Sequence, residues 1–437
     1  MTNPSDERVG RPWWTFAVPY PGPMPKLARK QWTVMGLLAA AELFDHYDMA
    51  IMGLALSQIQ EGLAIPETRV AGVNAVIRLG TLLAFGLTIM ADRLGRRRLL
   101  LATIVGFTVC TLATAFVRDA REFMLLQFAA RIFIGGETML AVVVIAEELN
   151  AEDRGFGIGL LGALGALGHG LAALVFGFVE VLPFGWRALY VVGVMPLLFL
   201  AWFRRGLPET QRFKSHSQTL QARTLRDRIE PVLHLMRMYP RRMGVLSVAI
   251  LPFDFVVASA FTFMPKTLQE VHGYSPGNVT VLFLTAGGLG ILGNIYAGIL
   301  GDRFGRKPVM CAGMVLNAVA IVGFYNASGW MLPPLWVMAV FTITGVGVLF
   351  KALGSELFPT SYRSTASGMR AVVATLGGVA GLAVEGPLYE IVGSHALAIT
   401  CMAPVLVLPP ILIATLLPET AARELEDISP EKPASAG

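Results

Sequence analysis

The stretch ADRLGRRRLL at residues 91–100 returns as GDRFGRKPVM at residues 301–310, an offset of 210 residues. The tetrapeptide LPET at 207–210 returns at 417–420 with the same offset. A looser third pair shares the offset to within one residue: EELNAEDRG at 147–155 and ELFPTSYRS at 356–364. Three unrelated patterns with one spacing indicate a duplicated chain. We therefore expect two homologous halves in the same orientation, a design suited to transport by rocking around a site near the membrane midplane.

The sequence around these repeats is strongly apolar. Of the 437 residues, 54% are hydrophobic and 15% are charged. A soluble domain is usually about 45–50% apolar and roughly 25% charged. Because more than half of a folded surface is apolar even in ordinary proteins, a soluble chain of this composition could not cover itself with polar groups. The composition therefore predicts a membrane protein.

The apolar runs predict the number of membrane-spanning helices. About 20 apolar residues cross the hydrocarbon core as a helix. Twelve such spans are expected, at residues 33–59, 69–90, 99–117, 122–148, 155–180, 187–204, 243–267, 279–300, 308–326, 332–355, 364–388 and 395–416. The expected fold class is an all-α membrane protein of 12 transmembrane helices in two pseudo-symmetric six-helix bundles. A proline-rich N-terminal tail, the first bundle, a central loop, the second bundle and a C-terminal tail are expected at 1–32, 33–206, 207–242, 243–417 and 418–437.

Basic residues gather in the loops on one side of these spans. The loops at residues 93–98 and 303–307 carry clusters of arginine and lysine, whereas loops on the other side are nearly balanced in charge. Such loops face the cytoplasm, so both termini are expected on the cytoplasmic side. The protein itself is expected in the plasma membrane, which is the inner membrane of a bacterium. No cleavable signal peptide is recognisable before residue 33. The formal charge of +5 therefore predicts a lipid bilayer as partner and no nucleic acid.

Signals for a cofactor, a metal or a catalytic centre are not found in the sequence. Cys110, Cys311 and Cys401 lie in apolar runs without metal-ligand spacing. The stretch GLGILG at 288–293 matches a dinucleotide fingerprint, but it lies inside an apolar span with no preceding strand, so helix packing explains it. No cofactor, no metal and no enzyme activity are expected.

The turns at residues 91–100 and 301–310 resemble the D-R-x-G-R-[RK] signature of the major facilitator superfamily. Finer features resemble its branch of sugar porters, aromatic-acid/proton symporters and organic-ion or synaptic-vesicle-like carriers. Those features are Asp45-His46-Tyr47-Asp48, Gly135-Gly136-Glu137, Glu147 with Arg154-Gly155, PKTLQEVHGYS at 265–275, ELFPTSYRS and the two LPET boxes. The resemblance covers nearly the whole chain. It implies a carrier that moves a small-molecule substrate together with protons and uses no cofactor.

Four ionisable residues interrupt the first span, AELFDHYDMAIMG at 41–53: Glu42, Asp45, His46 and Asp48. At 100° per residue they occupy a sector of about 160°, so all can face away from lipid. A charge at the bilayer centre costs about 2.5–3.5 kcal/mol, and a carboxylate can avoid this cost by pairing, by facing water or by taking up a proton. The resemblance implies that Asp48 couples protonation to transport, with Asp45 as a second candidate. A static ion pair that holds the bundle together is the alternative.

The fourth span departs from the family pattern R-x-x-x-G-x-G-x-G-G-E. Gln127 occupies the place of the family arginine, and Arg131 stands one turn further on. Positions i and i+4 share a helix face, so Arg131 is expected to reach Asp48 or Asp45 from a different depth. Glu137 matches the acidic residue of the pattern and is a candidate to share the proton or to make a packing hydrogen bond. Gln127 and His46 are expected near the substrate.

Three further cations lie inside expected spans, namely Arg78, Lys351 and Arg370. A cation at that depth needs an anion, supplied by a protein carboxylate or by a substrate. The protein partners available are Asp254, Glu356 and Glu385. We expect Arg370 and Lys351 to contact an anionic substrate, with Arg78 and Asp254 in the same site. Lys351 could alternatively extend to the cytoplasmic surface.

The resemblance implies that a set of residues near the repeated turns stabilises the closed conformations of the carrier. Gly95 and Gly305 permit tight turns, and the neighbouring arginines meet anionic lipids. The expected gating residues are Asp92, Arg93, Gly95, Arg96, Glu147, Arg154, Asp302, Arg303, Gly305, Arg306, Glu356 and Arg363.

The function predicted from the sequence is proton-coupled symport of a small organic anion, an aromatic or other monocarboxylate, by alternating access. A sugar or polyol symporter, a proton-driven exporter of organic cations or drugs, and a non-transporting membrane sensor are the alternatives. The chain is expected to act as a monomer.

Overall fold

A computed structural model of the chain describes residues 12, 25, 27–150, 153–205, 225–359 and 362–421. Within these residues the chain is almost entirely helical and forms no strand. Eleven helices are long and apolar enough to cross a membrane. Helix α1 (Arg29–Leu54) is also long enough, but the acidic stretch at 41–53 places Glu42, Asp45 and Asp48 among its apolar residues. The chain divides into two compact units.

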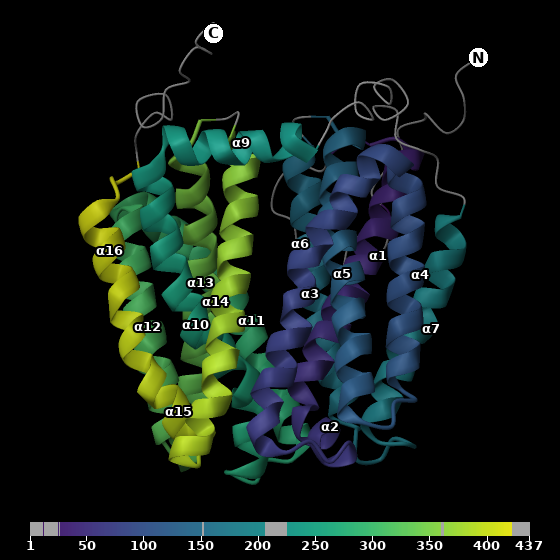
Figure 1. Cartoon of the computed structure of the whole chain (residues 1–437), viewed down its shortest axis with the longest axis vertical. Helices are drawn as coiled ribbons and strands as arrows, with labels where there is room; N and C mark the ends of the chain where they lie inside the picture. The colour runs from purple at the N-terminus through teal and green to yellow at the C-terminus, as the bar shows by residue number, and fades with distance from the viewer. Residues whose placement is uncertain are drawn as a thin grey trace, which may run out of the picture. The chain divides into compact units, whose positions relative to one another are not determined.

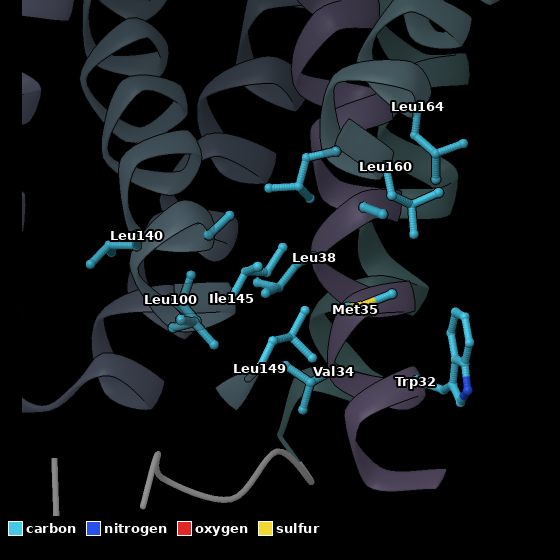
Figure 2. Close-up of a cluster of buried hydrophobic side chains, with 14 of the residues drawn as sticks. Trp32, Val34, Met35, Leu38, Leu100, Leu140, Ile145, Leu149, Leu160 and Leu164 are labelled. Atoms are coloured by element: carbon cyan, nitrogen blue, oxygen red, sulfur yellow. The ribbon is translucent and has the colours of Figure 1, made fainter. Parts of the chain in front are cut away.

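The first unit comprises residues 1–65 and 79–222. Its helices are α1 (Arg29–Leu54), α2 (Leu56–Gly62), the later part of α3 (Glu67–Leu94), α4 (Arg96–Thr114), α5 (Ala120–Glu148), α6 (Arg154–Phe176) and α7 (Trp186–Arg204). Helix α1 packs against α6 and α7, and α4 packs against α5 and α7 (Figure 1). Apolar side chains fill the end of this unit where α1, α4 and α6 begin and α5 ends. Figure 2 shows Met35 and Leu38 there beside Leu100, Ile145 and Leu160.

The second unit comprises residues 66–78 and 223–437, so it contains the first part of α3. Its other elements are α9 (Leu225–Met238), α10 (Pro240–Glu270), α11 (Pro276–Phe304), α12 (Arg306–Asn326), η3 (Gly329–Met331), α13 (Leu332–Glu356), α14 (Arg363–Val392), α15 (His395–Met402), η5 (Ala403–Val407) and α16 (Leu408–Leu416). Helix α9 packs on α10 and α14 and lies across their ends (Figure 1).

Every expected span corresponds to a helix, which confirms the predicted all-α membrane fold. The last span is broken into α15, η5 and α16 because prolines follow one another in this stretch, among them Pro404 and Pro409. Helix α9 is an element that the polar central sequence did not predict. The first LPET box and most of the C-terminal tail lie outside the described residues.

The duplication is visible in how helices touch within each unit. A Cβ atom on Gly168 of α6 would lie 2.0 Å from the Leu43 carbonyl oxygen of α1. In the second unit, a Cβ atom on Gly381 of α14 would lie 1.8 Å from the Phe255 carbonyl oxygen of α10. Only glycine allows so close an approach of two backbones. Both units therefore bring their first and fifth long helices together in the same way.

Candidate functional site

Four carboxylates are buried together in the first unit. Glu42, Asp45 and Asp48 lie along one face of α1, and Glu137 lies on α5. Their exposed fractions are between 1% and 5%. We call these four residues the acidic cluster. Electrostatic interactions connect Asp45 with each of the other three, so the candidate proton-coupling residues of α1 and α5 lie close together, as the sequence analysis expected.

Glu137 makes an ion pair that the sequence analysis missed. The Arg204 guanidinium, fully buried at the end of α7, binds the Glu137 carboxylate. Thr103 Oγ1 donates a hydrogen bond of 2.5 Å to the other carboxylate oxygen. Arg204 also donates to the Leu37 carbonyl oxygen at 3.1 Å. Arg204 ends its span, so its position in the sequence suggested a loop. Only the need of a buried carboxylate for a cation could have indicated it.

Asp48 and Arg131 interact electrostatically, as predicted from the altered pattern of the fourth span. Thr111 Oγ1 donates a hydrogen bond of 3.2 Å to one oxygen of Asp48. The hydroxyl of Tyr190 is buried nearby, within the electrostatic influence of both Asp48 and Arg131. Asp48 therefore has a neutral donor and a cation to stabilise its charged form.

Asp45 is surrounded differently. Within the described part of the chain, neither of its carboxylate oxygens has a hydrogen-bond partner. Its neighbour Glu42 lies next to His46, with 3.6 Å between Glu42 Oε1 and His46 Nδ1. A buried ionised carboxylate without donors is unfavourable, so this environment favours a neutral Asp45.

The two polar residues of this unit that were predicted near a substrate occupy different surroundings. Gln127 is fully buried and donates from Nε2 to Thr114 Oγ1 at 3.2 Å. His46 is partly exposed and stacks edge-on against His169, with ring centroids 5.0 Å apart. Gly165 leaves room for this pair, because a Cβ atom there would lie 2.8 Å from the His46 ring.

The second unit brings together the other four predicted substrate residues. The charge of Asp254 on α10 acts on both Arg78 of α3 and Arg370 of α14. The charge of Arg370 in turn acts on Lys351 of α13. A Cβ atom on Gly378 would lie 2.6 Å from Arg78 Nε, so this glycine gives the guanidinium its place against α14. We call Arg78, Lys351, Arg370 and Asp254 the cationic cluster.

Each DRxGR turn is linked to a glutamate at the end of a helix. Arg96 pairs with Glu147 at 3.1 Å, and Arg306 pairs with Glu356 at 3.3 Å. These two ion pairs are related by the sequence repeat. Arg306 also pairs with Asp302 at 2.7 Å.

The remaining gating residues contribute backbone conformation or surface charge. Gly95 and Gly305 have φ angles of 96° and 106°, in the region that favours glycine. Arg154 donates to the Leu149 carbonyl oxygen at 3.3 Å. Arg303 is exposed with its guanidinium 5.3 Å from the Phe304 ring, and Arg363 begins α14. The side chains of Asp92 and Arg93 lie outside the described residues.

The second LPET box caps a helix. Glu419 Oε1 accepts from the backbone N–H of Arg306 at 2.8 Å and Oε2 from that of Lys307 at 3.1 Å, at the start of α12. Burial raises the pKa of Glu419, but the N–H donors of Ala421, Arg306, Lys307 and Thr420 outweigh this, so its pKa is lowered from 4.5. A carboxylate at a helix N-terminus is also favoured by the helix dipole. Thr420 Oγ1 completes the link by donating to Glu356 at 2.6 Å.

Comparison with known proteins agrees with this architecture. The family model of the Major Facilitator Superfamily matches residues 38–294 and 277–436. The Bacillus subtilis protein NiaP, named as a niacin/nicotinamide transporter, is 28% identical over 90% of this chain and 97% of its own length. The benzoate transport protein of Acinetobacter baylyi is 23% identical over 85% of this chain and 86% of its own.

Solved structures show the same fold. A crystal structure of a D-xylose-proton symporter superposes with a TM-score of 0.73 and 18% identity, and the match covers 90% of this chain and 99% of that one. The family and these relatives are transporters and not enzymes, and the eleven apolar helices make the chain an integral membrane protein. The chain belongs to the Major Facilitator Superfamily.

Proposed function

We propose that the chain carries a small organic anion, an aromatic or other monocarboxylate, across the membrane together with protons, by alternating access. The observation that carries this proposal is the cationic cluster. Two guanidiniums, of Arg78 and Arg370, lie within spans of the second unit and interact with one carboxylate, Asp254, while the Lys351 ammonium interacts with Arg370. In the described part of the chain, this arrangement has a deficit of negative charge that a substrate carboxylate would fill.

The chemistry of the cluster suits a carboxylate better than a neutral substrate. A cation at the bilayer centre costs about 2.5–3.5 kcal/mol when it is unpaired. The planar fork of an arginine can bind both oxygens of a carboxylate at once. Arg370 and Lys351 are the proposed direct contacts, since the guanidinium of Arg78 lies against Gly378 of α14.

The names of the relatives support the same substrate class. Besides niacin and benzoate, gallate and cis,cis-muconate are substrates in the names of relatives from Pseudomonas putida and Acinetobacter baylyi. All four are carboxylic acids or their anions. The D-xylose symporter shares the fold, but a sugar would leave the positive charge of the cationic cluster unbalanced. An organic cation would be repelled by it.

The acidic cluster is the proposed proton site. Glu137 is held by Arg204, and Asp48 is stabilised by Thr111 and Arg131. Asp45 has no such donor in the described residues. We propose that a proton shared by Asp45 and Asp48 is taken up and released in each cycle, with Asp48 charged when it faces Arg131. We also propose cytoplasmic termini, a bacterial inner-membrane location and a monomer.

A competition assay on the purified protein tests the substrate class. We expect unlabelled benzoate or nicotinate, and neither a hexose nor a lipophilic cation, to displace bound labelled benzoate. Replacing Arg370 with glutamine should weaken benzoate binding about 10- to 150-fold. This range corresponds to the loss of one hydrogen bond to a charged group, which contributes about 1.5–3 kcal/mol. Arg241→Gln, at an exposed cation of α10, is the matched control and should bind as the wild type does. Displacement by the hexose or the cation alone would overturn the proposal, and binding without counterflow in proteoliposomes would favour a sensor.

A further inference from the structure

A second group of ionisable residues lies in the second unit, at the end opposite the GDRFGRKPVM turn. His395 is the first residue of α15, Glu67 is the first residue of α3, and Glu385 lies in the last turns of α14. His395 Nε2 lies 2.7 Å from Glu67 Oε1, and His395 Nδ1 lies 2.5 Å from Glu385 Oε1. One imidazole therefore bridges two carboxylates from different helices.

Two aromatic rings fix the orientation of this imidazole. The Phe263 ring stacks on one face with centroids 4.1 Å apart, and the Tyr389 ring stacks on the other at 4.4 Å. The ring can therefore present only its edge to polar neighbours, and both of its nitrogens point at carboxylate oxygens. The sandwich also excludes water from the two faces.

The hydrogen-bond pattern requires an extra proton. A neutral imidazole has one N–H donor and one acceptor, whereas an ionised carboxylate can only accept. With a neutral His395 and two ionised glutamates, one nitrogen lone pair would face an oxygen lone pair at hydrogen-bond distance. Both contacts become attractive when the three groups together hold one proton more, as an imidazolium between two carboxylates.

The surrounding charges agree with that count. Lys266 of α10 pairs with Glu67 at 3.0 Å and with Glu270 at 2.5 Å. Glu385 is fully buried, and no described residue hydrogen-bonds to its Oε2. The titratable groups that face the site are Glu67 of α3, Lys266 and Glu270 of α10, Tyr325 of α12, and Glu385 and Tyr389 of α14. Lys266 and an imidazolium together balance Glu67 and Glu385, while Glu270 is the more exposed carboxylate.

We infer that His395, Glu67 and Glu385 form a proton-binding site, separate from the acidic cluster, whose occupancy ties the start of α3 to the turn between α14 and α15. Loss of the proton at higher pH removes one of the two bridging contacts and leaves Glu385 without its cation. On the proposed orientation the site lies on the external side of the membrane, and external acidity strengthens the tie.

Hydrogen exchange of the full chain in detergent tests this inference. Amide exchange in residues 63–70 and 389–396 is compared at about pH 6 and about pH 8.5, on either side of the usual histidine range, after correction for the intrinsic rates. If the intact site of His395, Glu67 and Glu385 binds the proton more tightly than the locally opened state does, by one pKa unit, exchange at the higher pH is about tenfold faster. His395→Gln should exchange fast at both values. His395→Lys, which keeps a charge at both, should remove the pH dependence.

His272→Gln is the matched control, since His272 follows α10 at the same end and has no described ion pair. It should keep the wild-type behaviour. Equal protection of the wild type at both pH values, or a pH dependence that survives in His395→Gln, would overturn the inference. Asp48→Asn separates the two proton sites: it should abolish coupled uptake and leave the pH-dependent exchange unchanged. Failure of the transport proposal would therefore not be mistaken for failure of this one.

Discussion

Replacing Glu137 with glutamine removes the negative charge that faces Arg204 and keeps the size of the side chain. Arg204 is fully buried, and of its charged partners only Glu137 forms an ion pair with it in the described residues. Breaking a buried pair by removing one partner costs about 3–5 kcal/mol, because a buried charge is left uncompensated. Glu42 and Asp45 also interact with Arg204, and ionisation of either carboxyl group in the variant would supply part of the missing negative charge. We therefore expect a loss near the lower end, about 3 kcal/mol.

Thermal unfolding of the purified protein, followed by tryptophan fluorescence, measures this loss. At about 2–4 °C per kcal/mol, Tm should fall by roughly 6–12 °C. The double variant Glu137→Leu with Arg204→Met removes both charges and should recover most of the loss. Arg205→Gln changes an exposed cation next to Arg204 and should stay within about 0.5 kcal/mol of the wild type. If Glu137→Gln is as stable as this control, or the double variant is less stable than Glu137→Gln, the ion pair does not stabilise the protein as described.

Three other predictions follow from the structure. Asp45→Asn should fold as the wild type does, because Asp45 has no described hydrogen-bond partner, but it should lose proton-driven accumulation and keep exchange; wild-type accumulation in uptake assays would contradict this. Gly168→Ala should lower the free energy of unfolding by about 1–3 kcal/mol or more, since its Cβ would lie 2.0 Å from a backbone oxygen of Leu43. Gly162→Ala is the control and should be tolerated, because a Cβ there meets nothing within 4 Å. Equal Tm values for the two variants would contradict the prediction. Glu419→Gln should cost about 1 kcal/mol at neutral pH through the lost helix cap. Because the pKa of Glu419 is lowered from 4.5, this contribution is present above that value and vanishes as the pH falls through the folded-state pKa; a stability difference that persists in acid would contradict the cap.

The fold could be predicted from the sequence because the membrane leaves few choices. A helix satisfies all its backbone groups in lipid, so apolar runs of about 20 residues report spans directly. The repeats then predicted two homologous halves. The close contact of a glycine with the backbone of a neighbouring helix, at Gly168 in one half and Gly381 in the other, shows why the halves pack alike. The acidic stretch on α1 was equally visible, since charge inside an apolar span needs a reason.

The partners of buried charges could not be predicted in the same way. Arg204 and Glu137 come from different helices, and Arg204 stands where a span meets a basic loop. Glu67 and His395 are 328 residues apart, and each begins a helix where a polar residue is ordinary. Their pairing depends on how helices are arranged around each other, which hydropathy does not report. Helix α9 was missed because it lies in a polar segment.

Accumulation of a labelled aromatic acid in proteoliposomes tests the central claim most directly. With an inward proton gradient, the wild type should concentrate benzoate or nicotinate and lose it when a protonophore collapses the gradient. Asp48→Asn should catalyse exchange of preloaded substrate without concentrating it. Accumulation that is unaffected by the protonophore, or that persists in Asp48→Asn, would contradict the account.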